Sequence, residues 1–201
     1  MYKKKKITVY FPCRNEERHL EEVLARVPKW VDEVIVVSNR STDRTLEKAE
    51  ELGVRGIRDD REIGGIGYGF AHMTGIAQAT GDIIIAADGD ATYPVEEIGK
   101  MIDYLLARNL DFISCNRYPL QSGTTIPFML QLGVYVLNLE VRILYGTKIQ
   151  DILSGMWLFK REVRNKLLLT MGECNLSPEI KLKAALNPAI RFAEYSIAQH
   201  Q

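Results

Sequence analysis

The chain has 201 residues, of which 46% are hydrophobic and 26% are charged. These fractions are typical of a globular protein with one sizeable core rather than of a disordered or fibrous chain. Positive and negative side chains balance to a formal net charge of zero, so the charge gives no reason to expect a nucleic-acid partner. The three cysteines, Cys13, Cys115 and Cys174, form no CxxC pair, and their odd number argues against a disulfide framework. We therefore expect a reducing, cytosolic compartment.

Predicted strands and helices alternate through residue 115. Apolar and β-branched runs predict strands at 7–12, 33–37, 54–58, 83–87 and 111–115, and the spacing of apolar residues predicts helices at 16–27, 45–52, 68–79 and 94–108. This alternation with short connections predicts an α/β sheet with helices on both of its faces.

The segment 126–145 differs from the rest because it is long and very apolar. Its apolar residues follow two helical stripes, and its polar residues are limited to Gln131, Asn138, Glu140 and Arg142. A helix that is apolar on two faces must bury both. We expect it either to pack on the core and a dimer partner or to lie in the plane of a membrane surface, since its charges and a glycine argue against a spanning helix. Further strands are predicted at 155–160 and 190–197, and further helices at 161–170 and 178–186.

Polar segments follow four of the predicted strands, at 12–16, 38–43, 88–90 and 116–117. Ligands in open α/β sheets bind at the carboxyl ends of the strands. We therefore expect these four segments, which are far apart in sequence, to converge at one site.

Asp88 and Asp90 follow a predicted strand and are separated by one glycine. Two carboxylates this close repel each other and burial penalises both, so we expect a cation between them. Mg²⁺ or Mn²⁺ takes one or two carboxylates and completes its shell with substrate phosphates. Gly89 allows the backbone to turn so that both side chains face one point. The same pattern also forms simple turns, but the strand and the other three polar segments favour a metal site.

Three further features have both a structural and a functional interpretation. The glycine-rich segment 64–69 does not fit the P-loop or dinucleotide patterns, and it is either a tight turn or a close approach of the backbone to a ligand. Asp43 is best explained as a helix cap. Asp151 lies before the strand at 155–160, where a carboxylate is either a catalytic base or a residue that fixes the loop.

With these residues in place, the sequence resembles the family 2 glycosyltransferases of the GT-A fold, and among them the polyprenyl-phosphate (dolichol-phosphate) mannosyl- and glucosyltransferases. The resemblance covers nearly the whole chain. Its landmarks, weak singly but specific in this order, are Pro12-x-x-Asn15-Glu16-Glu17, Ser41-Thr42-Asp43-x-Thr45, Gly67-Tyr68-Gly69, Asp88-Gly89-Asp90-x-x-Tyr93-Pro94, Cys115-Asn116-Arg117-Tyr118 and Asp151-x-x-Ser154-Gly155-Met156. It implies a mixed, mostly parallel sheet flanked by helices. Residues 1–118 would form a nucleotide-sugar-binding half, and residues 119–201 an acceptor-binding half with amphipathic helices at a membrane interface.

The resemblance also implies roles for the matching residues. Asp90, Arg117 and Asp151 would be catalytic, with Arg117 near the diphosphate or the acceptor phosphate and Asp151 beside the acceptor. The cation, Mg²⁺ or Mn²⁺, would be held by Asp88 and Asp90. The nucleotide would be bound by Pro12, Arg14, Glu16, Asn39, Gly67 and Asp88.

Three departures from the family pattern bear on the substrate. Ser38-Asn39-Arg40 stands where the family usually has Asp-Asp-Gly; the Asn39 amide can still hydrogen-bond a base or ribose, and Arg40 adds a cation. Tyr68 replaces a common lysine, as in glucose-type relatives, which favours a UDP-sugar. The chain ends at Gln201, where relatives continue with a basic segment, and we therefore expect a truncated or minimal form.

The expected reaction is a single displacement that inverts the anomeric carbon and moves a hexose from a UDP- or GDP-sugar to a polyprenyl phosphate. A phosphate acceptor is ionised near pH 7, since its second pKa is about 6, and needs positioning more than deprotonation. A sugar hydroxyl would instead need Asp151 as a base. The expected location is peripheral, at the cytoplasmic face of a membrane, with a homodimer as one option. The alternatives are a family 2 transferase with a soluble or saccharide acceptor, and a catalytically impaired sugar-nucleotide-binding protein.

Overall fold

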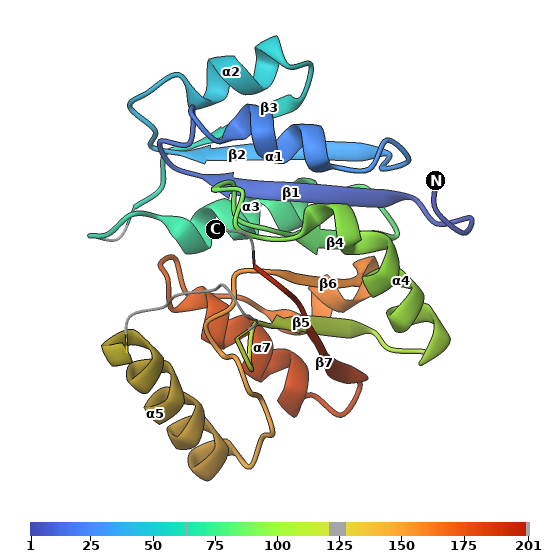
Figure 1. The fold of residues 1–201 in the computed structure, drawn as a ribbon, viewed down its shortest axis with the longest axis vertical. Coiled ribbons are helices and arrows are strands. Elements are labelled where there is room, and N and C mark those ends of the chain that lie inside the picture. The colour runs from blue at the N-terminus through green and yellow to red at the C-terminus, as the bar shows by residue number, and fades with distance from the viewer. Residues whose placement is uncertain (63, 121–127, 200–201) are drawn as a thin grey trace.

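A computed structural model describes residues 1–62, 64–120 and 128–199 (Figure 1). The described residues form one seven-stranded sheet in the order β3-β2-β1-β4-β6-β5-β7. Only β6 runs against its neighbours, β4 and β5, and the other strand pairs are parallel. This confirms the predicted mixed, mostly parallel sheet. The strands are β1 (Ile7–Cys13), β2 (Glu33–Asn39), β3 (Arg55–Asp59), β4 (Ile83–Ala86), β5 (Phe112–Asn116), β6 (Trp157–Lys160) and β7 (Phe192–Ser196).

Two layers of helices cover the sheet. Side chains alternate across each strand, so Val9 and Phe11 of β1 pack in one core with α1 and α4, whereas Tyr10 packs in a second core with α3 and α7. The helices are α1 (Leu20–Arg26), α2 (Thr45–Glu51), α3 (Tyr68–Gln78), α4 (Ile98–Ala107), α5 (Phe128–Tyr145), α6 (Arg164–Leu167) and α7 (Leu176–Leu186), with 3₁₀ turns at Val95–Glu97 and Arg161–Val163.

Two predicted helices are shorter in the structure. The helix predicted at 16–27 begins only at Leu20, and residues 17–19 form a turn before it. The backbone N–H groups of Glu16 and Glu17 donate to Thr45 and Asp43 at the start of α2. The helix predicted at 161–170 breaks into a 3₁₀ turn and the short α6, which ends where Leu168 takes a left-handed conformation with a φ of 43°. The positive φ of Leu168 is a boundary that apolar spacing does not show.

The sheet does not divide at residue 118. β5 belongs to the predicted nucleotide-binding half, yet it pairs with β6 and β7 of the predicted acceptor-binding half. The division into 1–118 and 119–201 therefore stays a prediction about function.

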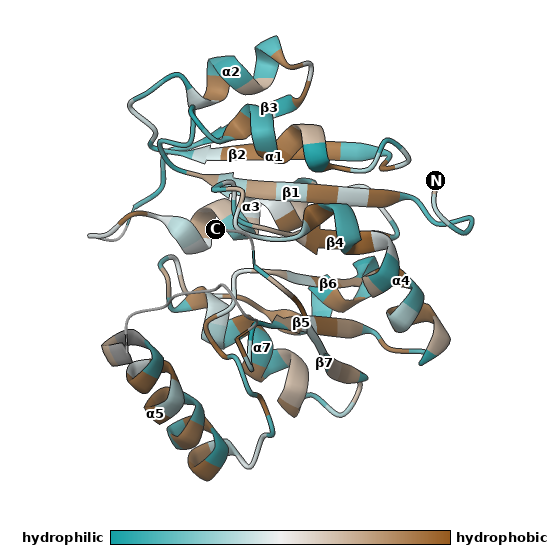
Figure 2. Cartoon of the chain, in the orientation of Figure 1, coloured by the Kyte–Doolittle hydropathy of each residue, from teal (hydrophilic) through white to brown (hydrophobic). Residues whose placement is uncertain are grey.

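Helix α5 is apolar over most of its surface, and most of that surface is exposed. Val141 packs with Ile149 and Ile152, but the exposed apolar residues include Met129, Leu132, Tyr135, Val136, Leu139, Ile143, Leu144 and Tyr145. Figure 1 shows α5 set apart from the sheet, and Figure 2 shows hydrophobic residues along α5, interrupted by hydrophilic ones. Within the described residues, no helix has the length and apolarity needed to cross a membrane. Residues 126 and 127, where this helix was predicted to begin, lie outside the described residues.

Candidate active site

A cleft of about 290 Å³ opens at the carboxyl ends of β1, β2 and β4. The parallel strands β2, β1 and β4 lie side by side, so the loops that follow them meet at one edge of the sheet. The lining residues are Pro12, Cys13, Arg14, Glu16, Asn39, Ile66, Tyr68, Ala71, Asp88, Gly89 and Asp90. The structure thus brings together all the predicted nucleotide-binding residues except Gly67, which lies between two lining residues in the chain.

Asp88 and Asp90 have different surroundings within the cleft. The Tyr68 hydroxyl donates to Asp88 Oδ1 at 2.9 Å, and the Thr92 hydroxyl donates to Asp90 Oδ1 at 2.7 Å. Burial, and secondly the charge on Asp90, raise the pKa of Asp88 to about 6. A Cβ atom on Gly155 would collide with the Asp88 carboxylate, so the glycine allows the backbone to pass directly behind it.

This pair of carboxylates fits a divalent cation. Burial of the Asp88 carboxylate, and secondly the negative charge of Asp90, raise the pKa of Asp88, and a cation bound between the two carboxylates would stabilise the ionised form. No cluster of three or more His, Cys, Asp or Glu side chains suited to a metal occurs among the described residues. Two carboxylates are nevertheless enough for Mg²⁺ or Mn²⁺ when substrate phosphates supply further oxygens.

Asn39 has a fixed orientation below the glycine-rich segment. Its Nδ2 atom donates to the carbonyl oxygens of Asp59 and Arg61 at 3.0 and 3.3 Å, and within the described part of the chain its buried Oδ1 atom has no hydrogen-bond partner. Gly67 has a φ of 73°, and a Cβ atom there would collide with the Asn39 amide. Arg40, the cation that the sequence adds beside Asn39, forms an ion pair with Glu62.

The glycine-rich segment is held by a carboxylate from another part of the chain. Glu173 accepts the backbone N–H groups of Ile66 and Gly67 at 2.8 and 3.0 Å. These N–H groups are therefore used by the protein itself, which supports the interpretation as a tight turn. The N-cap of α2 is Arg44, which makes no side-chain cap hydrogen bond, so Asp43 is not the helix cap that the sequence predicts. Asp43 lies one residue earlier and accepts the backbone N–H groups of Thr45 and Glu17 at 3.0 and 3.1 Å, which joins the start of α2 to the loop after β1.

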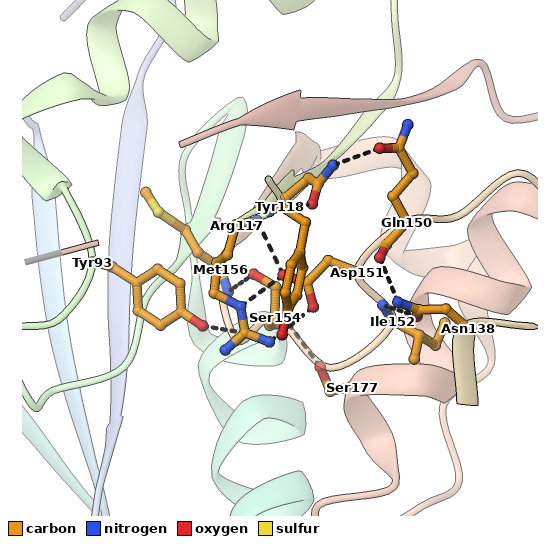
Figure 3. Close-up of polar contacts among 12 residues, drawn as sticks. Tyr93, Arg117, Tyr118, Asn138, Gln150, Asp151, Ile152, Ser154, Met156 and Ser177 are labelled. Atoms are coloured by element: carbon orange, nitrogen blue, oxygen red, sulfur yellow. Dashed lines mark hydrogen bonds and ion pairs between the residues drawn. The ribbon is translucent and has the colours of Figure 1, made fainter. Parts of the chain in front are cut away.

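Arg117 and Asp151 form a buried, bidentate ion pair (Figure 3). Arg117 Nε and Nη2 donate to the two carboxylate oxygens at 2.6 and 2.8 Å, and the Arg117 backbone N–H donates to Oδ2 at 3.0 Å. The Asp151 side chain is 0% exposed and that of Arg117 is 17% exposed. Burial alone would raise the pKa of Asp151, but the hydrogen bonds from Arg117 hold it below its usual range. This lowered pKa keeps Asp151 ionised, and each of its two carboxylate oxygens accepts a hydrogen bond from the guanidinium.

The loop that carries Asp151 is held by side chains from four other elements. Glu194 of β7 accepts the backbone N–H of Asp151, and Asn138 of α5 accepts that of Ile152 at 3.1 Å. The Tyr93 hydroxyl accepts the Gly155 N–H at 2.7 Å. The buried Lys181 of α7 donates to three backbone carbonyls of the loop. Because β6 runs antiparallel to β4, this loop enters the sheet at the edge where the other strands end.

Sequence reasoning missed Lys181. Burial lowers its pKa to about 7, but three carbonyl acceptors need three N–H donors, which only the ammonium form supplies. The signal was available: Lys181 lies four residues after Ser177 and next to Ile180, on the buried face of α7. A lysine in such a stripe indicates either that the helix prediction is wrong or that the lysine is a buried cation with hydrogen-bond partners.

A second, larger cleft of about 460 Å³ separates α5 from the site. Tyr118, next to Arg117, forms part of its wall together with Gln150, next to Asp151. The remaining lining residues come from α5: Gln131, Leu132, Val134, Tyr135, Asn138, Leu139 and Arg142. This cleft is therefore mainly apolar at α5 and polar where it adjoins the Arg117–Asp151 pair.

Residues 8–168 match the family model described as glycosyl transferase family 2. The chain belongs to this family. The predicted resemblance is thus confirmed, and the solved structures that the fold resembles are GT-A glycosyltransferases. One is the glucosyl-3-phosphoglycerate synthase of Mycobacterium tuberculosis in complex with Mn²⁺, UDP-glucose and phosphoglyceric acid, with a TM-score of 0.72, 20% identity, and coverage of 98% of this chain and 72% of that chain.

Curated relatives include enzymes named for dolichol-phosphate substrates. The chain is 36% identical to the dolichol-phosphate mannosyltransferase of Pyrococcus furiosus over 198 residues, covering 92% of this chain and 54% of that protein. It is 28% identical to the dolichyl-phosphate hexose transferase of Haloferax volcanii, covering 90% of this chain and 77% of that protein. It spans 38% of the low-salt glycan biosynthesis hexosyltransferase of H. volcanii, at 29% identity. Several relatives are therefore considerably longer than this chain.

Proposed function

We propose that this family 2 glycosyltransferase moves a hexose from a nucleotide-diphosphate sugar to a polyprenyl phosphate at a membrane surface. The observation that carries the proposal is the buried ion pair between Arg117 and Asp151. A hydroxyl acceptor must lose its proton to a base during transfer. Asp151 is poorly suited to that role, because its pKa is lowered and both of its oxygens accept hydrogen bonds from Arg117.

A phosphate acceptor removes the need for a base. Its oxygen is anionic near neutral pH, since the second pKa of a phosphate is about 6, and can attack the anomeric carbon directly. The new bond joins that oxygen to the carbon, and the bond to the diphosphate breaks with its electron pair on the leaving nucleoside diphosphate. Arg117 Nη1, which lies outside the pair with Asp151, would donate to a phosphate oxygen and hold it in line.

The donor would occupy the cleft at the ends of β1, β2 and β4. Its nucleoside would contact Pro12, Arg14, Glu16 and the Asn39 amide, with Gly67 closing over it. Asp88 and Asp90 would hold Mg²⁺ or Mn²⁺, which stabilises negative charge on a leaving diphosphate. The solved structure of similar fold with Mn²⁺ and UDP-glucose supports this placement at the level of the fold.

The exposed surface of α5 supports a lipid acceptor. Tyr135 and Ile143 of this helix are 67% and 72% exposed in the single chain, and a membrane surface would cover such an apolar face. The cleft between α5 and Tyr118 would offer a prenyl chain a partly apolar path that ends at Tyr118, the residue after Arg117. The names of the P. furiosus and H. volcanii relatives agree with this acceptor. Action at the cytoplasmic face of a membrane is part of the proposal, and a homodimer stays a prediction.

The test combines ligand binding and transfer. Thermal unfolding is followed with UDP, GDP, UDP-glucose and GDP-mannose, each with and without Mn²⁺, for the native chain and for Asp90→Asn. A ligand that binds the folded state raises the midpoint, so we expect a metal-dependent rise with one nucleotide that is lost in the variant. Transfer is then measured from that donor to a polyprenyl phosphate in detergent, to phosphoglyceric acid and to a simple sugar. Transfer to the sugar alone would refute the phosphate acceptor, and transfer to phosphoglyceric acid alone would establish a soluble one.

A further inference from the structure

The loop from Gln150 to Gly155 contacts both reactive parts of the proposed site. Asp151 binds the Arg117 guanidinium, and the Gly155 backbone lies directly behind the Asp88 carboxylate. Figure 3 shows Arg117 between Tyr93 and Asp151, with Ser154 and Ser177 beside them. A displacement of this loop would therefore move the acceptor-side cation and alter the wall of the metal site together.

Lys181 holds this loop from inside the protein. Its side chain is fully buried, and its Nζ atom donates to the carbonyl oxygens of Asp151, Ile152 and Ser154 at 2.9, 3.1 and 2.6 Å. The three N–H groups of the ammonium are thus all used on one loop. One helical turn earlier, the Ser177 hydroxyl also donates to the Ser154 carbonyl, at 2.8 Å.

Lys181 affects the site through its charge as well as through its hydrogen bonds. The carboxylates of Asp151 and Glu194 attract the ammonium, the Arg117 guanidinium repels it, and the Cys115 thiol lies close by. In turn the ammonium lowers the pKa of both Asp151 and Asp88. Burying a cation costs more than burying a neutral donor, so carbonyl binding alone does not explain a lysine here.

We propose that Lys181 is a positioning residue for glycosyl transfer, which fixes the carbonyls of Asp151, Ile152 and Ser154 and thereby holds Asp151 against Arg117 and Gly155 against Asp88. The consequence for transfer rests on the proposed function. The placement of the loop does not, and it can be measured without any substrate.

Hydrogen exchange followed by mass spectrometry tests the placement in the full chain, with Lys181→Met as the variant. Lys183→Met is the matched control, because Lys183 lies on the same helix but bonds outward to Glu179 and the Leu168 carbonyl. We expect backbone exchange in peptides covering 151–155 and 117 to become about tenfold faster or more in Lys181→Met, since hydrogen bonds to a charged donor are lost. Exchange rates in peptides from β1 and α4 should be the same as in the native chain, and so should the exchange rates of all peptides in Lys183→Met.

Two outcomes of the exchange measurement would overturn the proposal. Unchanged exchange at 151–155 and 117 would show that Lys181 does not fix the loop. If exchange in β1 and α4 became faster by the same factor as exchange in the loop, Lys181 would contribute only to global stability. Lys181→Gln, which retains two N–H donors without the charge, replaces Lys181→Met if the latter does not fold, with the same two criteria.

Transfer kinetics complete the test. We expect kcat for hexose transfer to a polyprenyl phosphate to fall about 10–100-fold in Lys181→Met, as for a small misplacement of reacting groups. Metal-free binding of the nucleoside diphosphate should change less than kcat, because Pro12, Arg14, Glu16 and Asn39, which would contact the nucleoside, lie on or after β1 and β2, away from the loop that Lys181 holds. An unchanged kcat would overturn the proposed role. Failure of the native chain to transfer at all would refute the proposed function, while the exchange result would still decide the role of Lys181 in the loop.

Discussion

His72 is a neutral histidine enclosed by aromatic rings. Its Nδ1 atom is 2.9 Å from the Tyr10 hydroxyl, and its ring contacts those of Tyr68 and Trp157. Its side chain is fully buried, and this burial lowers the pKa from 6.5 to about 3. The Tyr68 hydroxyl in turn donates to Asp88, so this uncharged cluster supports one of the two carboxylates proposed to hold the metal.

The first prediction concerns the pH dependence of stability. Between pH 6.5 and 3 the unfolded chain binds a proton at His72 that the folded chain does not, so stability falls as the pH falls, by about 1.4 kcal/mol per unit. His72→Phe should be less stable at pH 8, where it loses the bond to Tyr10, but should lack this part of the acid sensitivity. Urea unfolding of both proteins at pH 8, 6 and 5 measures the difference. Parallel curves for the two would show that His72 is protonated in the folded state.

The second prediction concerns the backbone behind Asp88. Gly155→Ala places a methyl group against the carboxylate, and we expect a loss of about 1–3 kcal/mol of stability together with a weaker metal-dependent response to nucleotide. Gly133→Ala is the matched control. Gly133 lies in α5 with open space around its Cβ position, so alanine there should stabilise the protein by up to about 1 kcal/mol. Calorimetry with and without Mn²⁺ and nucleotide distinguishes the two; an unaltered nucleotide response in Gly155→Ala would contradict the prediction.

At the scale of elements, helix α5 is the part of the fold whose surface is least explained by the rest of the chain. Its buried contacts are made by Val134 and Val141, and its polar contact to the site is made by Asn138. Leu137 packs partly buried beside Val141, whereas the exposed apolar residues of the helix include Met129, Leu132, Tyr135, Val136, Leu139, Ile143, Leu144 and Tyr145.

The third prediction is that α5 binds lipid. Each apolar side chain buried contributes about 1.5–3 kcal/mol, so Tyr135→Glu together with Ile143→Glu should weaken binding to anionic lipid vesicles at least tenfold. Leu186→Glu is the control, because Leu186 is a comparably exposed apolar residue, 47% exposed, on α7. Co-sedimentation with vesicles gives the affinities. Sedimentation without lipid tests the alternative. If the native chain is a dimer and the double variant is a monomer, the exposed surface of α5 is an interface with a second copy of the chain.

Apolar spacing predicted the sheet and most of the helices because these elements depend on local periodicity. The convergence of Asp88, Asn39 and Glu16 was also predictable, since parallel strands bring their carboxyl ends to one edge. The contacts of Lys181 and Glu173 were not, because they join α7 and its preceding loop to segments more than 25 residues away in the chain. The direction of β6, which brings the Asp151 loop to the same edge, also depends on pairing that a strand pattern does not encode.

At the scale of the molecule, one carboxylate joins three neighbouring strands of the sheet. Asp111, just before β5, accepts from Lys160 at the end of β6 at 2.9 Å and from Arg191, just before β7, at 2.7 Å through both Nε and Nη2. These hydrogen bonds hold the pKa of Asp111 well below its usual range, and the one from Arg191 has the largest effect. Their contribution is therefore present above about pH 4 and is lost as the pH falls further.

The fourth prediction follows from this junction. Asp111→Asn should lower the free energy of unfolding by about 2–4 kcal/mol at pH 7, because two cations lose their shared partner at a largely buried position. Asp60→Asn is the control: Asp60 and Arg58 are 3.9 Å apart with both side chains more than half exposed, and such pairs contribute about 0–1 kcal/mol. Guanidinium chloride unfolding at pH 7 compares the two, and equal stabilities would show that the sheet does not depend on Asp111.

The pairing of Arg117 with Asp151 has a consequence for how an acceptor is found. The pair carries no net charge, and the chain as a whole is neutral, so a phosphate in free solution meets little long-range attraction. Capture of the acceptor should accordingly depend weakly on ionic strength. For a protein seated on a bilayer through α5, the search takes place in two dimensions, and the transfer rate would follow the surface density of the lipid phosphate rather than its bulk concentration.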